Sequence, residues 1–372
     1  MLSSPENCVI QHRRSVKSAF IHVASKLRME LDLPLFEKQG KERFSELLAR
    51  KSLLNSPFFK GGILFLLSAV LAATMPLNHA AAQERVRMAL SVRNVVFLPF
   101  YYAKDTKIFD RHRLNVELIQ MRSDLQLAGL ASGEIDFTPS VGPAGAAIAN
   151  GLPVKALAVL YRAPLFSLVS PAVLASVKDL EGKTVAVSRI GSESHRYGSL
   201  MIENGGGDPK KVTFIQTGST TVSLTALQQS SVNAAVLSPP FTGIMAEKGY
   251  KILARSRSLL QDAPWLGLVA SRQKIERQTE QVKNMLRSMR DVIAAIKNEK
   301  SAVVSYIEKN FKVSAANANE SYDDIMGVMV EPLFLRDEQI QKYLDGSFAR
   351  GEMPKRLTTA EMFDFSLLRG IK

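Results

Sequence analysis

The segment Val86-Arg-Met-Ala-Leu-Ser-Val92 opens the stretch of sequence that decides the fold. Its pattern predicts a strand, and residues Pro99 to Phe109 predict a helix with the proline near its first turn. A second strand is predicted over Asn115-Val-Glu-Leu-Ile-Gln-Met121. Because two strands separated by a helix pair in parallel, the stretch predicts a βαβ unit.

Strands and helices go on alternating after this unit, which favours largely parallel sheets covered by helices on both faces. A change of register at Phe166-Ser-Leu-Val-Ser170 separates a second α/β series from the first. In the first series we expect helices at 124–132 and 143–150 and strands at 135–138 and 154–161. In the second we expect strands at 184–188, 212–215, 234–237 and 250–254 and helices at 193–203 and 224–229.

The chain after Trp265 is expected to return to the first series. Residues 266–270 predict a strand, and several helices follow it to the C-terminus. The helix predicted over 274–300 has apolar residues at a three-four spacing, which is typical of one buried face. We interpret that face as core packing.

Three stretches in this order resemble one protein family. They are Pro99 to Asp110 leading into Leu114-Asn-Val-Glu-Leu118, then Leu130-Ala-Ser-Gly-Glu-Ile-Asp-Phe137, then Asp179 to Val187 with Gly191-Ser192 beyond. The series is similar to that of periplasmic substrate-binding proteins of the nitrate/sulfonate/taurine ABC-transporter type, a group that includes binders of thiamine-pyrimidine precursors. The resemblance covers nearly all of residues 85 to 272.

The resemblance implies an α/β, type II periplasmic-binding-protein fold with two lobes, each a mostly parallel sheet flanked by helices, joined by two crossover strands. Lobe 1 would comprise residues 83–165 and 266–372, and lobe 2 residues 166–265, with the C-terminal helices packing mainly against lobe 1. The crossovers would lie near 166–170 and 262–270. The family captures a small molecule by lobe closure and delivers it to an ABC permease of the inner membrane, so we expect a monomer without a cofactor.

Candidate ligand-binding residues follow from where strands end. At the ends of parallel strands and the starts of helices, exposed backbone N–H groups and positive helix termini favour polar or anionic groups. Four loops and the lip of the same cleft satisfy this condition. The predicted residues are Arg93, Asn94, Phe97, Tyr101, Ser140, Val141, Gly142, Tyr161, Arg162, Ser188, Arg189, Gly191, Ser192, Ser238 and Pro239.

Each candidate also has a structural interpretation that involves no ligand. Ser192 and Ser194 are typical helix caps, and Gly191 can serve a backbone conformation alone. The three arginines at strand ends are individually typical of solvated surface, and Phe97, Tyr101 and Tyr161 of core aromatics. The group therefore carries the hypothesis rather than any one member.

An export signal is predicted before the first strand. A basic flank at Lys60 precedes the apolar run 63–73, and the small residues 80–82 form an A-x-A cleavage site after Ala82. A membrane anchor would need an apolar run of roughly 20 residues, which this run does not reach. Residues 1–59 are either an extended leader or the result of a start codon assigned too far upstream, the reading we favour. The product is expected in the periplasm.

The composition excludes several classes of protein. The single cysteine, Cys8, precedes the predicted cleavage, so the mature chain has no lipid attachment residue, disulfide or thiolate site. Its histidines, His112 and His195, lack a second ligand at metal-binding spacing, so no metal site is predicted. The net charge of +13 is scattered without a basic block, which argues against nucleic acid.

No catalytic motif is found either, since the chain has no P-loop, dinucleotide fingerprint or nucleophile elbow. We therefore predict that the chain is not an enzyme but the extracytoplasmic solute-binding component of an ABC importer. Its ligand would be a small organic molecule, sulfonate-like, carboxylate-like or pyrimidine-like. The alternatives are a pyrimidine-precursor synthase-like enzyme of the same fold and a ligand-sensing domain of a regulator.

Overall fold

The computed structural model describes residues 83–371 of the chain, and the predicted signal, its cleavage site and residues 1–59 lie outside them. The first group of strands contains β1 (Glu84–Leu90) and β2 (Leu114–Gln120), which pair in parallel. It also contains β3 (Thr138–Ser140) and β4 (Val154–Tyr161), which both pair antiparallel with β10 (Leu266–Ser271). A parallel bridge between Met88 and Phe137 joins β1 to the chain entering β3.

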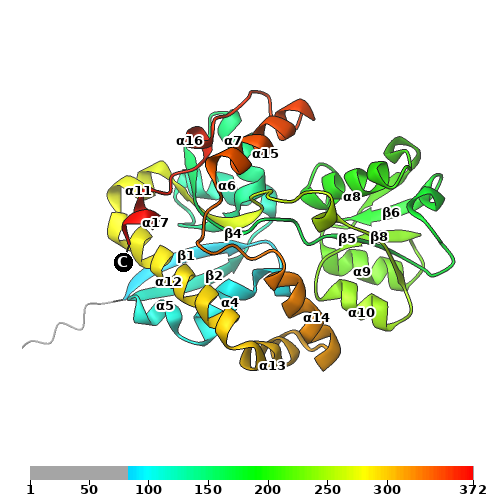
Figure 1. Cartoon of the computed structure of the whole chain (residues 1–372), viewed down its shortest axis with the longest axis horizontal. Coiled ribbons are helices and arrows are strands. Elements are labelled where there is room, and N and C mark those ends of the chain that lie inside the picture. Colours follow the sequence, from blue (N-terminus) through cyan, green and yellow to red (C-terminus); the bar gives the residue numbers. More distant parts are fainter. Residues whose placement is uncertain (1–82, 372) are drawn as a thin grey trace, which may run out of the picture. The chain divides into compact units, whose positions relative to one another are not determined.

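The second group of strands forms one sheet. Its members are β5 (Ser167–Ser170), β6 (Thr184–Val187), β7 (Thr213–Gln216), β8 (Ala234–Leu237) and β9 (Lys251–Arg255), in the order β7-β6-β8-β5-β9. Strand β6 is parallel to β7 and β8, and β5 is antiparallel to both of its neighbours. Figure 1 shows this sheet apart from β1, β2 and β4.

The two groups share one topology. In each, a single strand runs against the others, β10 in the first and β5 in the second. Each of these strands is the first that the chain forms after passing from one group to the other. The fold is thus an α/β arrangement with two crossing segments, in which the parallel strands of each group end at one edge.

Helices cover the strands. They are α4 (Leu98–Asp105), α5 (Ile108–Arg111), α6 (Ser123–Ser132), α7 (Val141–Ala149), α8 (Glu193–Asn204), α9 (Thr220–Gln228), α10 (Phe241–Glu247), α11 (Arg272–Arg277), α12 (Thr279–Asn298), α13 (Lys300–Phe311), α14 (Ala315–Met326), α15 (Asp337–Ala349), α16 (Thr359–Met362) and α17 (Ser366–Gly370). Short 3-10 helices occur at Val95–Phe97, Val177–Leu180, Pro209–Lys211 and Ser256–Ser258. Among residues 83–371, none of the helices has the length and apolarity that a bilayer span requires.

Most predicted elements begin or end at other residues in the structure, and three of the differences have a visible cause. The helix expected over 99–109 is two helices, because Lys107 takes a left-handed backbone with φ of 58° between α4 and α5. The helix expected over 274–300 is likewise divided, at Gln278 between α11 and α12. The strand expected at 135–138 begins only at Thr138, because the chain before it makes isolated contacts with β1 instead of a ladder.

The second sheet is apolar on both faces, and alternate residues of its strands supply the two faces. Leu168, Val185 and Val236 belong to a cluster that includes residues of α8, whereas Val169 and Ala186 belong to one that includes residues of α9 and α10. Figure 1 shows α8 on one side of this sheet and α9 and α10 on the other. Period-two alternation explains how one short strand serves two cores.

The first group packs around a larger core, to which α12 contributes its buried face. The predicted stripe on α12 is confirmed as core packing, since each of its members is at most 1% exposed: Val282, Met285, Leu286, Met289, Val292, Ile293 and Ile296.

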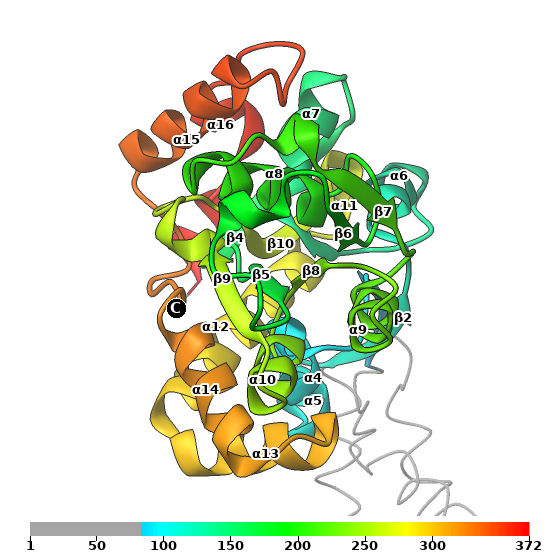
Figure 2. The same cartoon turned by 90° about the vertical axis from the view of Figure 1, so that its right-hand side faces the viewer.

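Helix α14 contacts both groups of strands. We expected the C-terminal helices to pack mainly against the first group, so the contacts of α14 with the second group were not predicted. Ala318, Tyr322 and Ile325 join the first core. On another face, the Asn317 side-chain amide donates to the carbonyl of Pro240 at 3.1 Å, and Asp324 accepts from Arg257 at 2.5 Å. Figures 1 and 2 both draw α14 beside α10.

Candidate functional site

The loops that follow β1 and β8 touch each other. The side-chain amide of Asn94 donates to the hydroxyl of Ser238 at 3.1 Å, and both residues are buried. Asn94 Oδ1 is buried without a hydrogen-bond partner. Because these loops leave the carboxyl ends of strands from different groups, the contact brings together the edges where α/β proteins bind ligands.

A second contact joins the start of α8 to the start of α7. The Glu193 carboxylate lies so close to Gly142 that a Cβ atom at position 142 would come within 3.0 Å of Oε1, with Trp265 Cδ1 at 3.5 Å. The Gly142 N–H donates to the Trp265 carbonyl at 3.0 Å. Glu193 therefore occupies the space that the missing side chain of Gly142 leaves open.

Aromatic rings lie on and beside the two segments that cross between the groups of strands. The Tyr161 and Trp265 rings are stacked with centroids 6.4 Å apart, and Phe166 lies edge-on to Trp265 at 5.6 Å. Tyr197 of α8 stacks on Phe166 at 5.7 Å. The Tyr161 hydroxyl is fully buried without a hydrogen-bond partner, and burial raises its pKa well above the ordinary value.

The charge of Glu193 is poorly compensated. Its Oε1 lies 3.7 Å from the Arg196 guanidinium, beyond hydrogen-bond distance, and is buried without a hydrogen-bond partner. Arg196 instead donates to Glu352 at 3.1 Å and to the Tyr197 hydroxyl at 2.9 Å. Burial raises the pKa of Glu193, and Arg196 and Trp265 offset only part of that rise.

The three arginines predicted as anion anchors are not brought together. Arg93 lies over the Tyr101 ring at 4.8 Å, and its guanidinium is 5.8 Å from the Phe311 ring centroid. Arg162 is exposed, with Nε 3.4 Å from Asp262. Arg189 lies close enough to Asp124 to be one of the charges that lower the pKa of that carboxyl, against the effect of burial.

The predicted serines of the second and third loops bind protein groups. Ser140 donates to Gln126 at 2.5 Å. The hydroxyls of Ser188, Ser192 and Ser194 lie within 3.2 Å of one another, and Ser192 donates to the Arg189 carbonyl.

The capping interpretation of Ser192 is corrected by these contacts. Ser192 occupies the N-cap position of α8 but makes no side-chain cap hydrogen bond, because its hydroxyl is committed to the loop. Gly191 has φ of +79°, which agrees with its interpretation as a backbone requirement. The turn it allows brings its N–H to His195 Nδ1 at 3.2 Å.

The other predicted residues are packed against the protein itself. Val141 and Pro239 are buried, and Phe97 and Tyr101 are half-buried against the first core. Asn94, Gly142, Tyr161 and Ser238 are thus the predicted residues that the structure places at the contact between the groups. Glu193, Arg196 and Trp265 were not predicted. An acidic residue in the first turn of a helix is common for electrostatic reasons, so Glu193 carried no distinctive signal.

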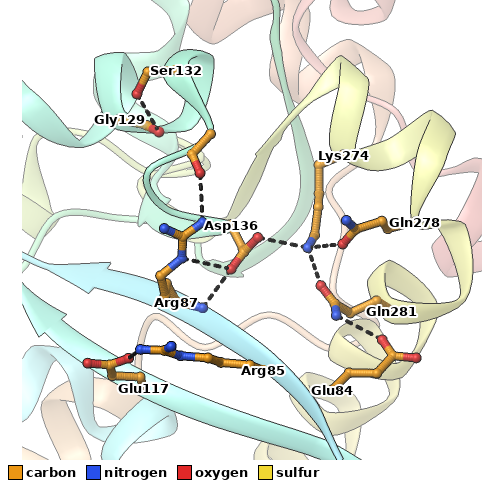
Figure 3. A network of polar contacts seen from close by, with 11 residues as sticks. Glu84, Arg85, Arg87, Glu117, Gly129, Ser132, Asp136, Lys274, Gln278 and Gln281 are labelled. Atoms are coloured by element: carbon orange, nitrogen blue, oxygen red, sulfur yellow. Dashed lines mark hydrogen bonds and ion pairs between the residues drawn. The ribbon is translucent and has the colours of Figure 1, made fainter.

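A hollow of about 970 Å³ lies elsewhere, on residues of β1, α11 and α12 with Asp136. Its buried cation, Lys274, donates to Asp136 at 2.8 Å and also to Gln278 and Gln281 (Figure 3). Gln281 in turn donates to Glu84 at 2.8 Å. Since the groups of this network already satisfy one another, we interpret it as a tie between β1 and the C-terminal helices.

No group of three or more metal-ligating side chains occurs within residues 83–371.

The model of the family described as NMT1/THI5 like matches residues 94–302 of the chain. No curated protein matches this chain.

Solved structures similar to this chain include periplasmic binding proteins. The alkanesulfonate-binding protein SsuA from Xanthomonas axonopodis pv. citri, bound to MOPS, is 18% identical with a TM-score of 0.63, over 76% of this chain and 98% of its own. The aliphatic sulphonate binding protein SsuA from Escherichia coli is 17% identical with a TM-score of 0.61, over 75% and 97%. The nitrate-binding protein NrtA from Synechocystis PCC 6803 is 14% identical with a TM-score of 0.60, over 77% and 87%. These similarities establish that the predicted fold is correct.

Proposed function

The chain belongs to the NMT1/THI5-like family, and from that premise we propose that it is the solute-binding component of an ABC importer. It captures a small organic molecule between lobe 1, residues 83–165 with 266–372, and lobe 2, residues 166–265. The lobes close on the ligand, and the closed form delivers it to an inner-membrane permease. The protein acts as a monomer without enzymatic activity.

The observation that carries the proposal is the set of buried polar atoms without hydrogen-bond partners between the two groups of strands. Asn94 Oδ1, Tyr161 Oη, Glu193 Oε1 and Arg196 Nε all belong to it. A buried polar group that makes no hydrogen bond costs about 1–3 kcal/mol, so several in one place favour a site that a ligand completes.

The contacts between the facing loops support capture by closure. Asn94 meets Ser238 and Glu193 meets Gly142 across the two groups, so a ligand that enters must replace these contacts with its own. Polar contacts suit this exchange, because water hydrates the polar side chains when the lobes part, so breaking these contacts costs little free energy. The aromatic row beside them offers apolar surface to the body of a small organic ligand.

Thermal unfolding with a ligand panel tests the proposal. Sulfonates, carboxylates, pyrimidines and amines are added separately at millimolar concentration, and binding raises Tm because a ligand that binds only the folded state stabilises it. The Asn94→Ala variant should lose the stabilisation. Asn150→Ala is the matched control, since Asn150 is exposed and bonds only within its helix. A Tm that stays unchanged with every class of ligand would refute the proposed function.

Export is proposed on the sequence pattern alone. We propose that a signal peptidase cuts after Ala82, so that the periplasmic protein begins at Gln83. Intact-mass measurement of the protein from a periplasmic extract tests the cut. A mass that includes residues before Gln83, or recovery only from the cytoplasm, contradicts it.

A further inference from the structure

The unpartnered polar atoms between the lobes are mainly hydrogen-bond acceptors. Asn94 Oδ1 and Glu193 Oε1 only accept, as does Asp262 Oδ1, which already lies 3.4 Å from Arg162, whereas Arg196 Nε is the one atom of the set that only donates. The hydroxyl of Tyr161 does both. A ligand that completes this set has to supply donors.

Positive charge near these atoms is already compensated. Arg196 is held by Glu352 at 3.1 Å, and Arg162 lies 3.4 Å from Asp262. Arg93 is stacked on Tyr101. A sulfonate or carboxylate ligand would have to displace these partners before it gained a guanidinium.

The start of α7 is also a poor binding site for an anion. The Gly142 N–H, which is one of the first donors of that helix, is bonded to the Trp265 carbonyl at 3.0 Å. The Glu193 carboxylate lies against the same residue, where its negative charge would repel an anion. The geometry that makes a helix start attractive to anions is therefore cancelled here.

Resting on the proposed function, we propose that Glu193 determines the specificity of the cleft. Its carboxylate selects a ligand that presents a protonated amine or amidine-type N–H group on a small apolar or aromatic body. The N–H group binds Oε1, and the body lies against Trp265 and the neighbouring rings. Arg196 stays with Glu352, so the ligand's N–H group adds to the partial compensation that Arg196, at 3.7 Å, gives Glu193.

Probes with one body and different charge test this proposal by calorimetric titration. Benzamidine is cationic, benzamide is neutral with N–H donors, and benzenesulfonate is anionic, while the phenyl body is common to all. Wild type should bind benzamidine best. Glu193→Gln should weaken benzamidine at least tenfold, which corresponds to about 1.4 kcal/mol, and should strengthen benzenesulfonate. Glu203→Gln, an exposed position on the same helix, is the matched control and should change neither.

Unfolding of the ligand-free variants provides a second measurement. Glu193→Gln removes the charge of a side chain that is 25% exposed but whose Oε1 is buried 3.7 Å from Arg196, so its Tm should equal or exceed that of wild type. A lower Tm would make Glu193 a structural partner and overturn the proposal.

The outcomes separate the two proposals. Benzenesulfonate bound by wild type and unaffected by Glu193→Gln, or benzamidine bound equally by both proteins, overturns the role of Glu193 and leaves solute binding intact. If no probe binds and the panel of sulfonates, carboxylates, pyrimidines and amines also leaves Tm unchanged, the proposed function falls as well.

Discussion

Replacing Gly142 by alanine adds a methyl group where the carboxylate of Glu193 lies. The new Cβ atom would be under 3.0 Å from Oε1, a separation that real contacts do not show, so the carboxylate has to withdraw. Within α7 alone the change is not expected to destabilise, because Gly142 lies in the first turn and alanine has a higher helix propensity than glycine. The substitution therefore separates the stability of lobe 1 from the contact between the lobes.

The size of the effect follows from overpacking, which costs about 1–3 kcal/mol in a packed interior. That cost applies only when Glu193 and residue 142 are in contact. It should lower the population of the closed form, and with it the apparent affinity for a ligand, by roughly 5- to 150-fold. The free energy of unfolding of lobe 1 should not fall.

Two assays measure the effect of Gly142→Ala on closure and on affinity. Small-angle X-ray scattering reports the separation of the lobes, and titration with a bound member of the ligand panel reports affinity. The double variant Gly142→Ala with Glu193→Ala should recover closure, because the clashing carboxylate is gone. Gly145→Ala is the matched control in the same helix, since its added methyl meets the flexible Met353 and Met362 side chains.

Two results would refute this reasoning. One is an unchanged scattering profile and affinity for Gly142→Ala, which would mean that Glu193 does not meet α7 in the closed form. The other is an equal loss in Gly145→Ala, which would assign the effect to α7 rather than to the contact between the lobes.

Further predictions concern stability. Lys274→Met removes the buried cation closest to Asp136, which keeps only the longer ion pair with Arg87 at 3.7 Å, and should lower the free energy of unfolding by about 3 kcal/mol in a denaturant titration. Arg85→Ala, at an exposed ion pair, should leave the midpoint unchanged. Burial raises the folded-state pKa of Glu193 above its ordinary 4.5, so its contribution to stability is fully present below pH 4.5 and is lost as pH rises through the folded-state pKa. Wild type should therefore lose stability relative to Glu193→Gln as pH rises above 4.5, and a constant difference would contradict the shift. Gly267→Ala would place Cβ well within 3.0 Å of a backbone oxygen of β4 and should abolish soluble folded protein by circular dichroism, whereas Gly370→Ala, with open space around it, should not.

The pH prediction depends on the charges around Glu193. Arg196 comes from the same helix and stays protonated throughout the range. Glu352 lies across from it on the segment after α15; burial raises the pKa of Glu352, but Arg350 and Arg196 bring it below the ordinary value. Glu352 is therefore ionised from pH 5 to 8, and the change in the difference between the two proteins reports Glu193.

Local patterns were sufficient for much of the fold. Strands β4 and β8 have the predicted bounds, because continuous apolar runs between turn residues are distinctive of strands buried on both faces. The divisions of helices at Lys107 and Gln278 were not predicted. Neither residue is a glycine or proline, so the local sequence carries no signal for a break in the helix.

The division of roles on α14 also required the structure. Its apolar residues Ala318, Tyr322 and Ile325 predict one buried face, but its polar Asn317 and Asp324 look like solvated surface in sequence. They are buried because α10 and the return segment from β9 lie against them. A sequence pattern shows which face is apolar, not which polar face meets another part of the chain.

The sequence by itself determined the alternation of strands and helices, the family and the loops in which a site is expected, because these depend on short-range periodicity and on motifs in order along the chain. Only the tertiary structure decided which residues of those loops face one another. It directed Arg93, Arg162 and Arg189 to partners in the protein and placed Glu193 against Gly142. The physical reason is that the direction and charge compensation of a side chain depend on neighbours that are distant in sequence, and no local pattern encodes them.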